Sequence, residues 1–458
     1  MRTQDSPIQK LANLKHRFQS IRANLRHGFP YKKLKIIGVT GTDGKTTTTM
    51  MIYHILKQNK IKAAYISTIK AQIGNNEIDT GFHVTTPEPW DVPKYLDMMV
   101  KAGTDIAILE TTSQGLEQNR LWGMNFDAAA ITNIKSDHLD YHRTWENYAK
   151  SKFKILEKLS NGGLAVLNKD DAKSYDWLKK NADKLNEDNR FNILWYSKND
   201  VKNFKYSVDG LKFKYKGVDF ALPLLGEYNL ENALAAINIC NKYLRLPLIA
   251  KALKSFQTPN GRMEIIQKKP FISIIDFAHT PNALENALKS LAPLRSSGGR
   301  IIAVFGCAGK RDKKRREMGR IAGKLADIIV ITAEDPRTEN LFEINYDIIN
   351  YAHQAKGEVI KRFKDDKNFR ATDIKSLETA IDNSITQDQK PIIVFDEESI
   401  QNRIDAIELA TKIAKEGDIV FLTGKAHEES LCFGSTEYPW NEHTYLKHAL
   451  KALHSDKK

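Results

Sequence analysis

A short segment near the start of the chain carries the residue types that bind phosphate. Gly41 and Gly44 are followed by Lys45, Thr46 and Thr47, between a β-branched run and a helix-like run. Glycines let backbone N–H groups approach phosphate closely, and the amino end of a helix favours negative charge. Lysine can reach terminal phosphates, while threonine supplies a hydroxyl for Mg²⁺. We therefore predict a nucleotide-phosphate loop at the residues Gly41, Thr42, Asp43, Gly44, Lys45, Thr46 and Thr47.

The spacing of this loop limits the class of nucleotide-binding protein. Five residues rather than the usual four separate Gly38 from Gly44, so the shorter core Gly-x-x-Gly-Lys-Thr is what matches a phosphate loop. Residues 133–137 do not form the Asn-Lys-x-Asp motif of a GTPase, and neither α/β series contains the Gly-x-Gly-x-x-Gly of a dinucleotide oxidoreductase. A strand-like run ends at Glu110, which is suited to hold a metal ion beside the phosphates. The sequence therefore predicts phosphate transfer rather than hydride transfer.

Two series of alternating strand-like and helix-like segments position these residues. Such alternation predicts parallel sheets covered by helices. The expected fold class is α/β, with a central P-loop-type parallel-sheet ATPase domain followed by a Rossmann-like domain. The expected strands are 35–40, 63–67, 105–109 and 128–132 in the first series, and 271–277, 300–306, 327–332, 391–395 and 418–423 in the second. We place the domains at 1–30, 31–258 and 259–458, with a small antiparallel excursion between about 190 and 224.

Composition excludes several other classes of protein. The 458 residues exceed what one core usually serves, and no apolar run could span a bilayer or act as a signal peptide. Three well-separated cysteines argue against a disulfide framework or a thiolate zinc site and fit a reducing cytosol. The net charge of +14 comes largely from lysines spread along the chain without a nucleic-acid motif, so it favours anionic substrates. We expect a cytoplasmic monomer that binds small molecules and no nucleic acid.

The first thirty residues predict a basic amphipathic helix. Its apolar residues recur at helical spacing, and lysines and arginines occupy the other faces. The apolar residues are Ile8, Leu11, Leu14, Phe18, Ile21 and Leu25. Such a helix can lie on an anionic membrane, which would give residues 1–28 a peripheral membrane contact. More often it packs its apolar stripe on its own protein, and we favour that interpretation.

Nine further segments, in order along the chain, resemble the Mur ligases, specifically the UDP-N-acetylmuramoyl-tripeptide synthetase branch. They are 85–87, 110–116, 132–133 with 137–142, 228–233, 261–264, 276–281, 306–312, 335–337 and 424–428. The resemblance implies an ATP-dependent acid–amino-acid ligase of peptidoglycan synthesis. In this chemistry an acceptor carboxylate attacks the γ-phosphate of ATP, and an amine then displaces phosphate from the acyl phosphate. Two Mg²⁺ ions are implied as the cofactor.

The resemblance also implies a role for individual residues. Lys45, His138 and Lys152 are expected to be catalytic. The metal ligands are expected to be Thr46, Glu110, His138 and Lys152, the last as a CO₂-derived carbamate on a helix over 144–159. The residues that contact ATP outside the loop are expected to be Asn232, Arg262 and Asp276. The acceptor residues are expected to be Thr85, Thr86, Thr112, Gln118 and Arg120. The amino-acid residues are expected to be Arg311, Asp335, Arg337, Gly424 and Glu428.

The resemblance places Arg337 where that branch uses an arginine to pair bidentately with a distal carboxylate, which implies meso-diaminopimelate as the amino acid. The sequence departs from the family pattern at four places. Asp43 replaces an asparagine, Thr112 a serine and Gln114 a histidine, while Asp335 stands in a Glu-Asp-Pro-Arg segment rather than Asp-Asn-Pro-Arg. The first departure affects the phosphate loop, the next two affect the acceptor site, and the last affects the amino-acid site.

The start of the chain leaves the identity of the acceptor substrate undetermined. In the family a separate domain precedes the ATPase domain and binds uridine diphosphate, whereas about thirty residues precede the first strand here, too few for such a domain. The alternatives are a muramoyl-peptide with weakly held uridine, a non-uridylated or lipid-linked acceptor, a folylpolyglutamate-synthase-like ligase, and a nucleotide-binding protein that does not ligate. The intact set of Lys45, Thr46, Glu110 and His138 argues against the last.

Overall fold

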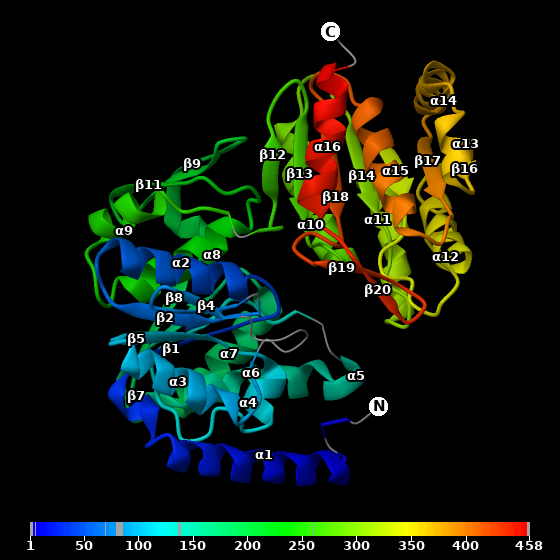
Figure 1. Ribbon diagram of the computed structural model, residues 1–458. Coiled ribbons are helices and arrows are strands. Elements are labelled where there is room, and N and C mark those ends of the chain that lie inside the picture. The colour runs from blue at the N-terminus through cyan, green and yellow to red at the C-terminus, as the bar shows by residue number, and fades with distance from the viewer. Residues whose placement is uncertain are drawn as a thin grey trace. The chain divides into compact units, whose positions relative to one another are not determined.

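The computed structural model describes residues 3–4, 6–68, 70–78, 86–135, 139–258 and 260–455. The chain divides into two units (Figure 1). Unit 1 comprises Met1–Tyr206, Gly210–Pro223 and Tyr228–Gln257, and unit 2 comprises Ser207–Asp209, Leu224–Glu227 and Thr258–Lys458. Each unit is built around its own sheet, so we describe each by itself.

Unit 1 contains an eight-stranded sheet with the order β4-β3-β2-β5-β1-β6-β7-β8. The neighbours from β2 to β8 are parallel, while β3 and β4 form an antiparallel edge. β1 is central and buried from its second residue onward, as its run of β-branched residues predicts. The strands are β1 (Lys35–Thr40), β2 (Ala63–Ile66), β3 (Ala71–Ile73), β4 (Asn76–Ile78), β5 (Ile106–Glu110), β6 (Phe126–Ile131), β7 (Leu159–Asn168) and β8 (Asn192–Tyr196).

Helices cover both faces of this sheet (Figure 1). On one face α2 packs against α8 and α9, and on the other α3, α6 and α7 contribute Leu96, Tyr148 and Leu178 to one hydrophobic core. The helices are α1 (Pro7–Arg26), α2 (Lys45–Gln58), α3 (Asp91–Lys101), α4 (Ser113–Glu117), α5 (Leu139–His142), α6 (Trp145–Glu157), α7 (Ala172–Leu185), α8 (Asn229–Cys240) and α9 (Leu246–Leu253), with 3₁₀ turns η1 (Pro30–Lys33) and η2 (Lys198–Asp200). A separate three-stranded sheet is formed by β9 (Val201–Ser207), β10 (Gly210–Tyr215) and β11 (Val218–Leu222).

Unit 2 contains a seven-stranded sheet with the order β12-β13-β18-β14-β15-β17-β16, in which only β12 is antiparallel to its neighbour. Its strands are β12 (Glu264–Gln267), β13 (Ile272–Asp276), β14 (Ile301–Phe305), β15 (Ile328–Ile331), β16 (Gly357–Phe363), β17 (Lys390–Phe395) and β18 (Ile419–Thr423), and a hairpin joins β19 (Ser430–Phe433) to β20 (Thr436–Pro439). Its helices are α10 (Pro281–Leu291), α11 (Met318–Leu325), α12 (Leu341–His353), α13 (Asp366–Arg370), α14 (Ile374–Thr386), α15 (Ile400–Lys412) and α16 (Glu442–Ser455), with 3₁₀ turns η3 (Ala292–Leu294) and η4 (Lys313–Glu317).

The predicted α/β fold class is confirmed, and every strand expected in the two series is present. The antiparallel excursion is also present, although β8 leaves it and joins the main sheet instead. The strand β16 carries no clear sequence signal, because it lies at the sheet edge and its residues Val359-Ile360-Lys361-Arg362 do not alternate between apolar and polar.

The amino-terminal helix is present as α1, but the expectation that it packs through its apolar stripe is wrong. Its buried residues are mainly polar, whereas Leu11 and Phe18 in the stripe are 68% and 59% exposed. The polar residues can be buried because they find hydrogen-bond partners on the rest of unit 1. Among the residues that the structure describes, no helix combines the length and apolarity needed to cross a bilayer.

Candidate active site

The predicted phosphate loop connects β1 to α2, the arrangement that the sequence predicts. Gly44 has a φ of +81°, and a Cβ at this position would lie 2.0 Å from Oδ1 of Asn232. Only glycine allows both the backbone angle and this close approach. Asn232 is held on α8 by a 2.8 Å hydrogen bond from its Nδ2 to Oδ1 of Asn229. The predicted nucleotide residue Asn232 therefore lies directly beside the loop.

The residues that follow β6 hold the loop from another side. Thr132 donates from Oγ1 to the carbonyl of Asp43 at 2.6 Å, and the backbone N–H of Asp43 donates to Oδ1 of Asn133 at 3.0 Å. The N–H of Thr42 donates to the carbonyl of Asn133 at 3.0 Å. Nζ of Lys135 lies 3.3 Å from Oδ2 of Asp43, so the charge that this aspartate adds to the loop is paired.

Thr46 and Glu110 converge beneath the loop. Oγ1 of Thr46 donates to both carboxylate oxygens of Glu110 at 3.0 Å, and both side chains are buried. Glu110 also accepts from the N–H and the hydroxyl of Thr68 at 2.9 and 2.8 Å. Nζ of Lys45 donates to the carbonyl of Thr42 at 2.8 Å, which holds the ammonium over its own loop. A hydroxyl and a carboxylate are the hard oxygen ligands that Mg²⁺ accepts.

Lys152 reaches the same loop from α6, the helix expected over 144–159. Its side chain is 2% exposed, and Nζ donates to the carbonyl of Gly41 at 2.6 Å. Nζ also lies 4.4 Å from the ring centroid of Tyr148, whose hydroxyl is 3.2 Å from Oγ1 of Thr42. Lys152 occupies a different face of α6 from the exposed Lys150.

The neighbouring lysines of α6 differ in how exposed they are. Lys150 is exposed, but Lys154 is half-buried. Lys158, just after α6, donates to the carbonyl of Leu121 at 3.2 Å, and burial lowers the pKa of its ammonium. The lysines toward the end of the helix are therefore less exposed than Lys150 is.

Four of the five predicted acceptor residues form one hydrogen-bonded cluster. Oγ1 of Thr112 caps α4 by accepting from the N–H of Gly115 at 2.9 Å, and Oγ1 of Thr86 accepts from the N–H of Thr112 at 2.9 Å. Arg120 donates to the carbonyl of Thr86 at 2.9 Å and to Oε1 of Gln118 at 2.8 Å. Burial lowers the pKa of the Arg120 guanidinium. Nη1 of Arg120 also lies 3.1 Å from Oε1 of Glu88, so the positive charge of the cluster is already paired within the chain.

Two predicted residues, Thr85 and His138, lie outside the described residues. Among the described residues, no group of three or more His, Cys, Asp and Glu side chains could hold a metal ion. A magnesium site made of Thr46 and Glu110 is compatible with this, because Mg²⁺ is usually held by one or two carboxylates, substrate phosphates and water.

In unit 2, Arg262 and Asp276 lie next to each other at the start of the second sheet. The N–H groups of Met263 and Ala278 donate to the two carboxylate oxygens of Asp276 at 2.7 and 2.8 Å. Burial raises the pKa of Asp276, and the positive charge of Arg262 opposes this rise. The guanidinium carbon of Arg262 lies 4.9 Å from the ring centroid of Phe277, and its Nε is buried with no hydrogen-bond partner within the described part of the chain.

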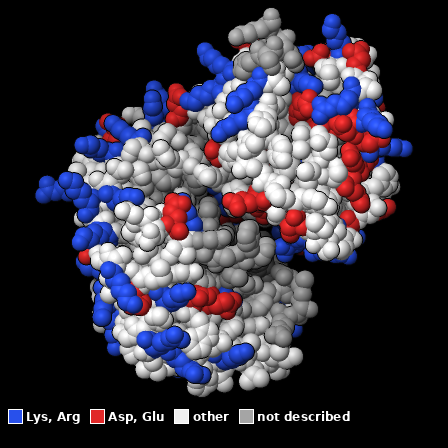
Figure 2. Space-filling view, viewed as in Figure 1, with Lys and Arg blue, Asp and Glu red and all other residues white. Residues whose placement is uncertain are grey.

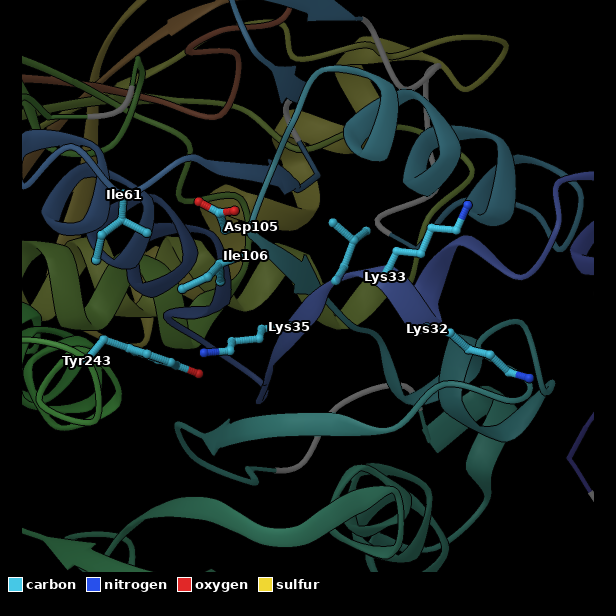
Figure 3. A pocket seen from close by; sticks show the side chains of 8 residues that line it. Lys32, Lys33, Lys35, Ile61, Asp105, Ile106 and Tyr243 are labelled. Carbon is cyan, nitrogen blue, oxygen red and sulfur yellow. The ribbon is translucent and has the colours of Figure 1, made fainter.

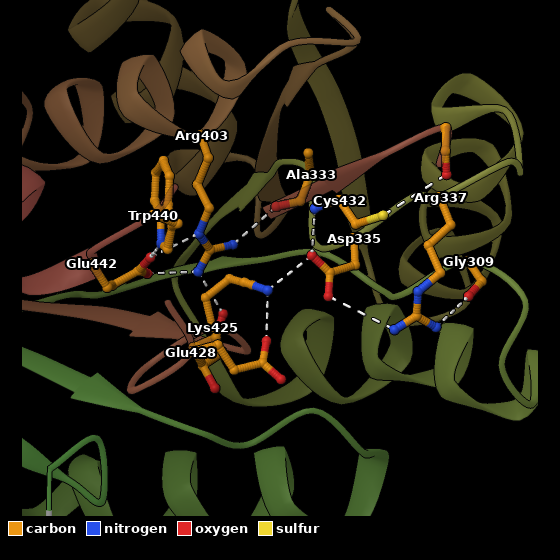
Figure 4. A network of polar contacts seen from close by, with 12 residues as sticks. Gly309, Ala333, Asp335, Arg337, Arg403, Lys425, Glu428, Cys432, Trp440 and Glu442 are labelled. Carbon is orange, nitrogen blue, oxygen red and sulfur yellow. Dashed lines mark hydrogen bonds and ion pairs between the residues drawn. The ribbon is translucent and has the colours of Figure 1, made fainter. Parts of the chain in front are cut away.

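The predicted amino-acid residues form a charge cluster after β15 and β18 (Figure 4). Nζ of Lys425 lies 2.8 Å from Oδ1 of Asp335 and 2.6 Å from Oε2 of Glu428. Nη1 of Arg337 donates to the carbonyl of Gly309 at 3.3 Å, and its Nη2 lies 3.9 Å from Oδ2 of Asp335. Asp335 and Arg337 both have positive φ angles, of +43° and +55°. Such strain in non-glycine residues is typical of functional sites.

Gly424 and Arg311 belong to the same charge cluster. Gly424 has a φ of +107°, and a Cβ there would lie 2.5 Å from Oε2 of the buried Glu334. Burial raises the pKa of Glu334 to about 8, although Arg403 counteracts part of this rise. Burial and the nearby charge of Arg337 lower the pKa of the Arg311 guanidinium.

Comparison with known proteins identifies the family. Residues 39–240 match the family described as Mur ligase middle domain, and residues 261–395 match Mur ligase, glutamate ligase domain. A UDP-N-acetylmuramoyl-L-alanyl-D-glutamate--2,6-diaminopimelate ligase of Chlamydia felis is 34% identical over 416 residues, which are 88% of this chain and 75% of the relative. The chain belongs to the Mur ligase family.

Two further proteins resemble this Mur ligase. A UDP-N-acetylmuramyl-tripeptide synthetase of Borreliella burgdorferi is 35% identical over 461 residues, which are 96% of this chain and 81% of the relative. A solved structure that bears the same name as the Chlamydia felis ligase has 28% identity and a TM-score of 0.64, and the match covers 97% of this chain and 84% of that one. Members of the Mur family are ATP-dependent peptide ligases, so the chain is an enzyme of that class.

Several residues of this Mur ligase take part in the site geometry without having been singled out. The hydroxyl of Tyr141 donates to Glu117 at 2.8 Å and accepts from Gln118 at 3.2 Å, and burial raises its pKa. Nε2 of His142 lies 2.9 Å from Oγ of Ser113. Tyr141 and His142 lie in a segment that carries the family resemblance, whereas no motif marks Glu117.

A pocket of about 640 Å³ lies elsewhere in the Mur ligase, at the amino ends of β1 and β5 (Figure 3). Nζ of Lys35 lies there, 5.8 Å from the ring centroid of Tyr243. The lining residues are Lys32, Lys33, Leu34, Lys35, Ile61, Asp105, Ile106 and Tyr243. The pocket contains none of the predicted site residues, and ligands of parallel sheets bind at the carboxyl ends of the strands. It is therefore not the active site.

Proposed function

We propose that this Mur ligase adds meso-diaminopimelate to a muramoyl-dipeptide-type acceptor in peptidoglycan synthesis, through an acyl phosphate made with ATP. The observation that carries the proposal is the convergence of Lys45, the Thr46–Glu110 pair and Lys152 on one loop in unit 1. The acceptor cluster around Arg120 lies in the same unit. The names of the relatives support the choice of both acceptor and amino acid.

We assign a role to each of the two larger predicted domains. Residues 31–258 would bind ATP and the acceptor, because they contain the phosphate loop, Glu110 and the acceptor cluster. Residues 259–458 would bind the amino acid through the charge cluster, and would contact the nucleotide through Arg262 and Asp276. The cytoplasm is the compartment that we propose, since ATP is available there and the three cysteines are buried free thiols.

In the first step an acceptor carboxylate oxygen attacks the γ-phosphorus of ATP. The bond between that phosphorus and the β,γ-bridging oxygen breaks, so ADP leaves and an acyl phosphate remains. The N–H groups at residues 41–47 and the Lys45 ammonium offset the charge that spreads over the phosphate oxygens. The Lys45 ammonium now donates to the carbonyl of Thr42, and it would exchange this contact for the phosphate oxygens.

Thr46 and Glu110 are the residues that would hold Mg²⁺, which when bound neutralises charge on the phosphates. We keep His138 and carbamylated Lys152 as the proposed ligands of a second ion. Burial of Lys152 against Gly41 supports its place beside the phosphates. As an ammonium it donates to Gly41, whereas a carbamate would present anionic oxygens instead, so modification would exchange this contact for one to a cation.

In the second step the neutral amine of the amino acid attacks the acyl carbon, and phosphate leaves with its bridging oxygen as the amide forms. Glu428 is suited to hold an ammonium group, because it is the more exposed of the two carboxylates that pair with Lys425, and Arg311 and Arg337 are suited to hold a carboxylate. Lys425 is closer to Asp335 than Arg337 is, at 2.8 against 3.9 Å. Asp335 is therefore paired mainly with Lys425, and Arg337 keeps its capacity for the distal carboxylate of diaminopimelate.

The test is an assay of ADP formation with UDP-muramoyl-dipeptide and a panel of amino acids, followed by the mass of the product. We expect amide product and ADP in equal amounts, with the highest kcat/KM for meso-diaminopimelate. A higher kcat/KM for lysine or ornithine would refute the donor assignment alone. Product only from a folate acceptor and glutamate would support a folylpolyglutamate-type ligase instead, and no ADP with any acceptor would support a nucleotide-binding protein that does not ligate.

A further inference from the structure

The helix α1 packs on the rest of unit 1 with its polar side facing inward. Its buried residues are Gln9, Asn13, Ser20, Ala23 and Asn24. The opposite side carries exposed apolar residues, which are 47–68% exposed. They are Ile8, Leu11, Leu14, Phe18 and Leu25. A helix that merely covered its own protein would bury the apolar side, so this orientation requires a reason.

Specific hydrogen bonds fix the helix in this orientation. Nδ2 of Asn13 donates to Oε1 of Glu117 at 2.6 Å, and Oγ of Ser20 donates to the carbonyl of Asn119 at 3.1 Å. At the end of the helix, Nδ1 of His27 lies 3.1 Å from a carboxylate oxygen of Asp97. These contacts tie α1 to the end of α4, to the segment that follows α4, and to α3. The apolar side therefore faces outward because the polar side is bound, not because the helix is detached.

Positive charge borders the apolar stripe on both sides. With about 100° of rotation per residue, Lys10 and Arg17 lie along one border, and Lys15, Arg22 and Arg26 lie along the other. All five are exposed, and α1 contains no aspartate or glutamate. Figure 2 shows Lys and Arg side chains gathered over this part of unit 1.

The surface continues beyond the helix. The 3₁₀ turn η1, which follows α1 in the chain, packs on the same helix α3 and adds the exposed Lys32 and Lys33. Trp90, 39% exposed at the start of α3, lies under the guanidinium of Arg22 at 5.8 Å. An apolar stripe with basic borders and an aromatic ring at one edge is the composition of a helix that lies in a bilayer interface.

Other occupants fit this surface less well. Two copies of the chain packed through α1 would bring five positive charges from each helix together, with no acidic residue on either helix to pair with them. An apolar protein surface would cover the stripe but would leave the bordering charges without partners. Anionic lipid headgroups supply the negative charge, and the acyl boundary accepts the apolar side chains.

We propose that α1 is an in-plane anchor that binds this Mur ligase to the surface of an anionic phospholipid bilayer. The inference rests on the helix alone and does not depend on the proposed ligase activity. It also has a consequence for the enzyme. Ser20 is hydrogen-bonded to the segment that carries Gln118 and Arg120, so the anchor would hold the acceptor cluster at a fixed distance from the membrane.

The test is co-sedimentation of the full chain with vesicles of phosphatidylcholine alone or mixed with phosphatidylglycerol, at low and high salt. We expect binding to the mixed vesicles only, weakened by salt because the basic borders are exposed. The double variant Leu11→Ser/Phe18→Ser should bind at least about tenfold more weakly. The control Leu248→Ser, at an exposed apolar position on α9, should bind like the parent chain. Replacing Lys15, Arg22 and Arg26 by glutamine should weaken binding by about fivefold per charge.

Each alternative has its own outcome. No binding to either vesicle at low salt, or equal binding by the double variant and the parent chain, would overturn the proposal. A concentration-dependent dimer that the double variant loses would assign the stripe to a second copy and would also overturn it. Equal melting temperatures for all variants check that they fold, since the replaced side chains are exposed. Ligase activity on a water-soluble acceptor, measured without vesicles, tests the proposed function separately.

Discussion

The phosphate loop of unit 1 and the charge cluster of unit 2 are both suited to anionic groups, but they are built in different ways. The loop relies on backbone N–H groups, the hydroxyl of Thr46 and one lysine, and its supporting hydrogen bonds run mostly to the backbone. The charge cluster sets side-chain cations directly against carboxylates, with Lys425 between Asp335 and Glu428.

This difference indicates a division of labour. A backbone cradle recognises any phosphate of the right shape, which suits a co-substrate common to many ligases. Opposed side-chain charges recognise a particular arrangement of ammonium and carboxylate groups, because the wrong ligand leaves a charge unpaired. We therefore expect substitutions in the loop to abolish turnover with every amino acid, and substitutions in the charge cluster to change which amino acid is used.

The largest effect is expected from Lys45→Ala. Loss of the ammonium removes stabilisation of the charge that grows on the transferred phosphate, at a cost of at least about 3 kcal/mol, or about a hundredfold in rate. ADP formation at saturating substrates measures it, and Lys57→Ala near the exposed end of the same helix is the control. Turnover near the parental rate would mean that the phosphate site is wrongly assigned.

A loss of similar size, about a hundredfold, is expected from Lys152→Ala, while Lys150→Ala on the exposed face of α6 should have little effect. A small carboxylate such as formate should partly restore activity if Lys152 acts as a carbamate. The contact to Gly41 also fits an unmodified ammonium, which an added carboxylate cannot replace. Loss of activity without any rescue by carboxylate, together with no carbamate signal in labelled CO₂, would assign Lys152 a purely cationic role.

A smaller and more selective effect is expected in the charge cluster. Arg337→Ala should raise KM for meso-diaminopimelate by about tenfold to a hundredfold, because a bidentate pair with the distal carboxylate is lost. Weak activity with lysine should be unaffected, since lysine has no such group. The more exposed Arg320 on α11, replaced by alanine, is the control. An equal loss with both amino acids would show that Arg337 supports the site without selecting the donor.

The smallest expected effect concerns stability and pH. Burial raises the pKa of Glu334 from 4.5 to about 8. Below pH 4.5 the carboxyl is protonated in both folded and unfolded chains, whereas between 4.5 and about 8 only the unfolded chain releases the proton. Rising pH therefore favours unfolding across this window, and Glu334→Gln removes the effect.

The melting temperature of Glu334→Gln minus that of the parent chain should accordingly increase by a few degrees as the pH rises from 5 to 8. Glu358→Gln, at an exposed position on β16, is the matched control and should show no such increase. A constant difference between Glu334→Gln and the parent chain across this window would contradict the raised pKa.

The two regions also differ in how well the sequence predicts them. Glycine, lysine and threonine of the phosphate loop are neighbours in the chain, so their spacing alone indicates the site. The pairing of Lys425 with Asp335 joins residues 90 positions apart, and the burial of Glu334 against Gly424 depends on where two strands end. Lys425 and Glu334 lie in segments that the sequence marks, but their pairing and burial could not be predicted before the fold was known.

The orientation of α1 shows another limit of the sequence. Helical spacing identifies which residues share a face, but it does not say which face is buried. The polar face is buried because Asn13 and Ser20 meet Glu117 and Asn119, which lie about a hundred positions away along the chain. Such partners are specified by tertiary structure, so periodicity alone led to the wrong face.

The most direct test of the ligase assignment follows the oxygen atoms of the acceptor. The chain is incubated with ATP, meso-diaminopimelate and an acceptor whose free carboxylate carries a heavy oxygen isotope, and the released phosphate is analysed by mass. Attack by that carboxylate on the γ-phosphorus predicts that one labelled oxygen appears in the phosphate for each amide formed. Amide formation with unlabelled phosphate would contradict an acyl phosphate, and labelled phosphate without amide would contradict ligation.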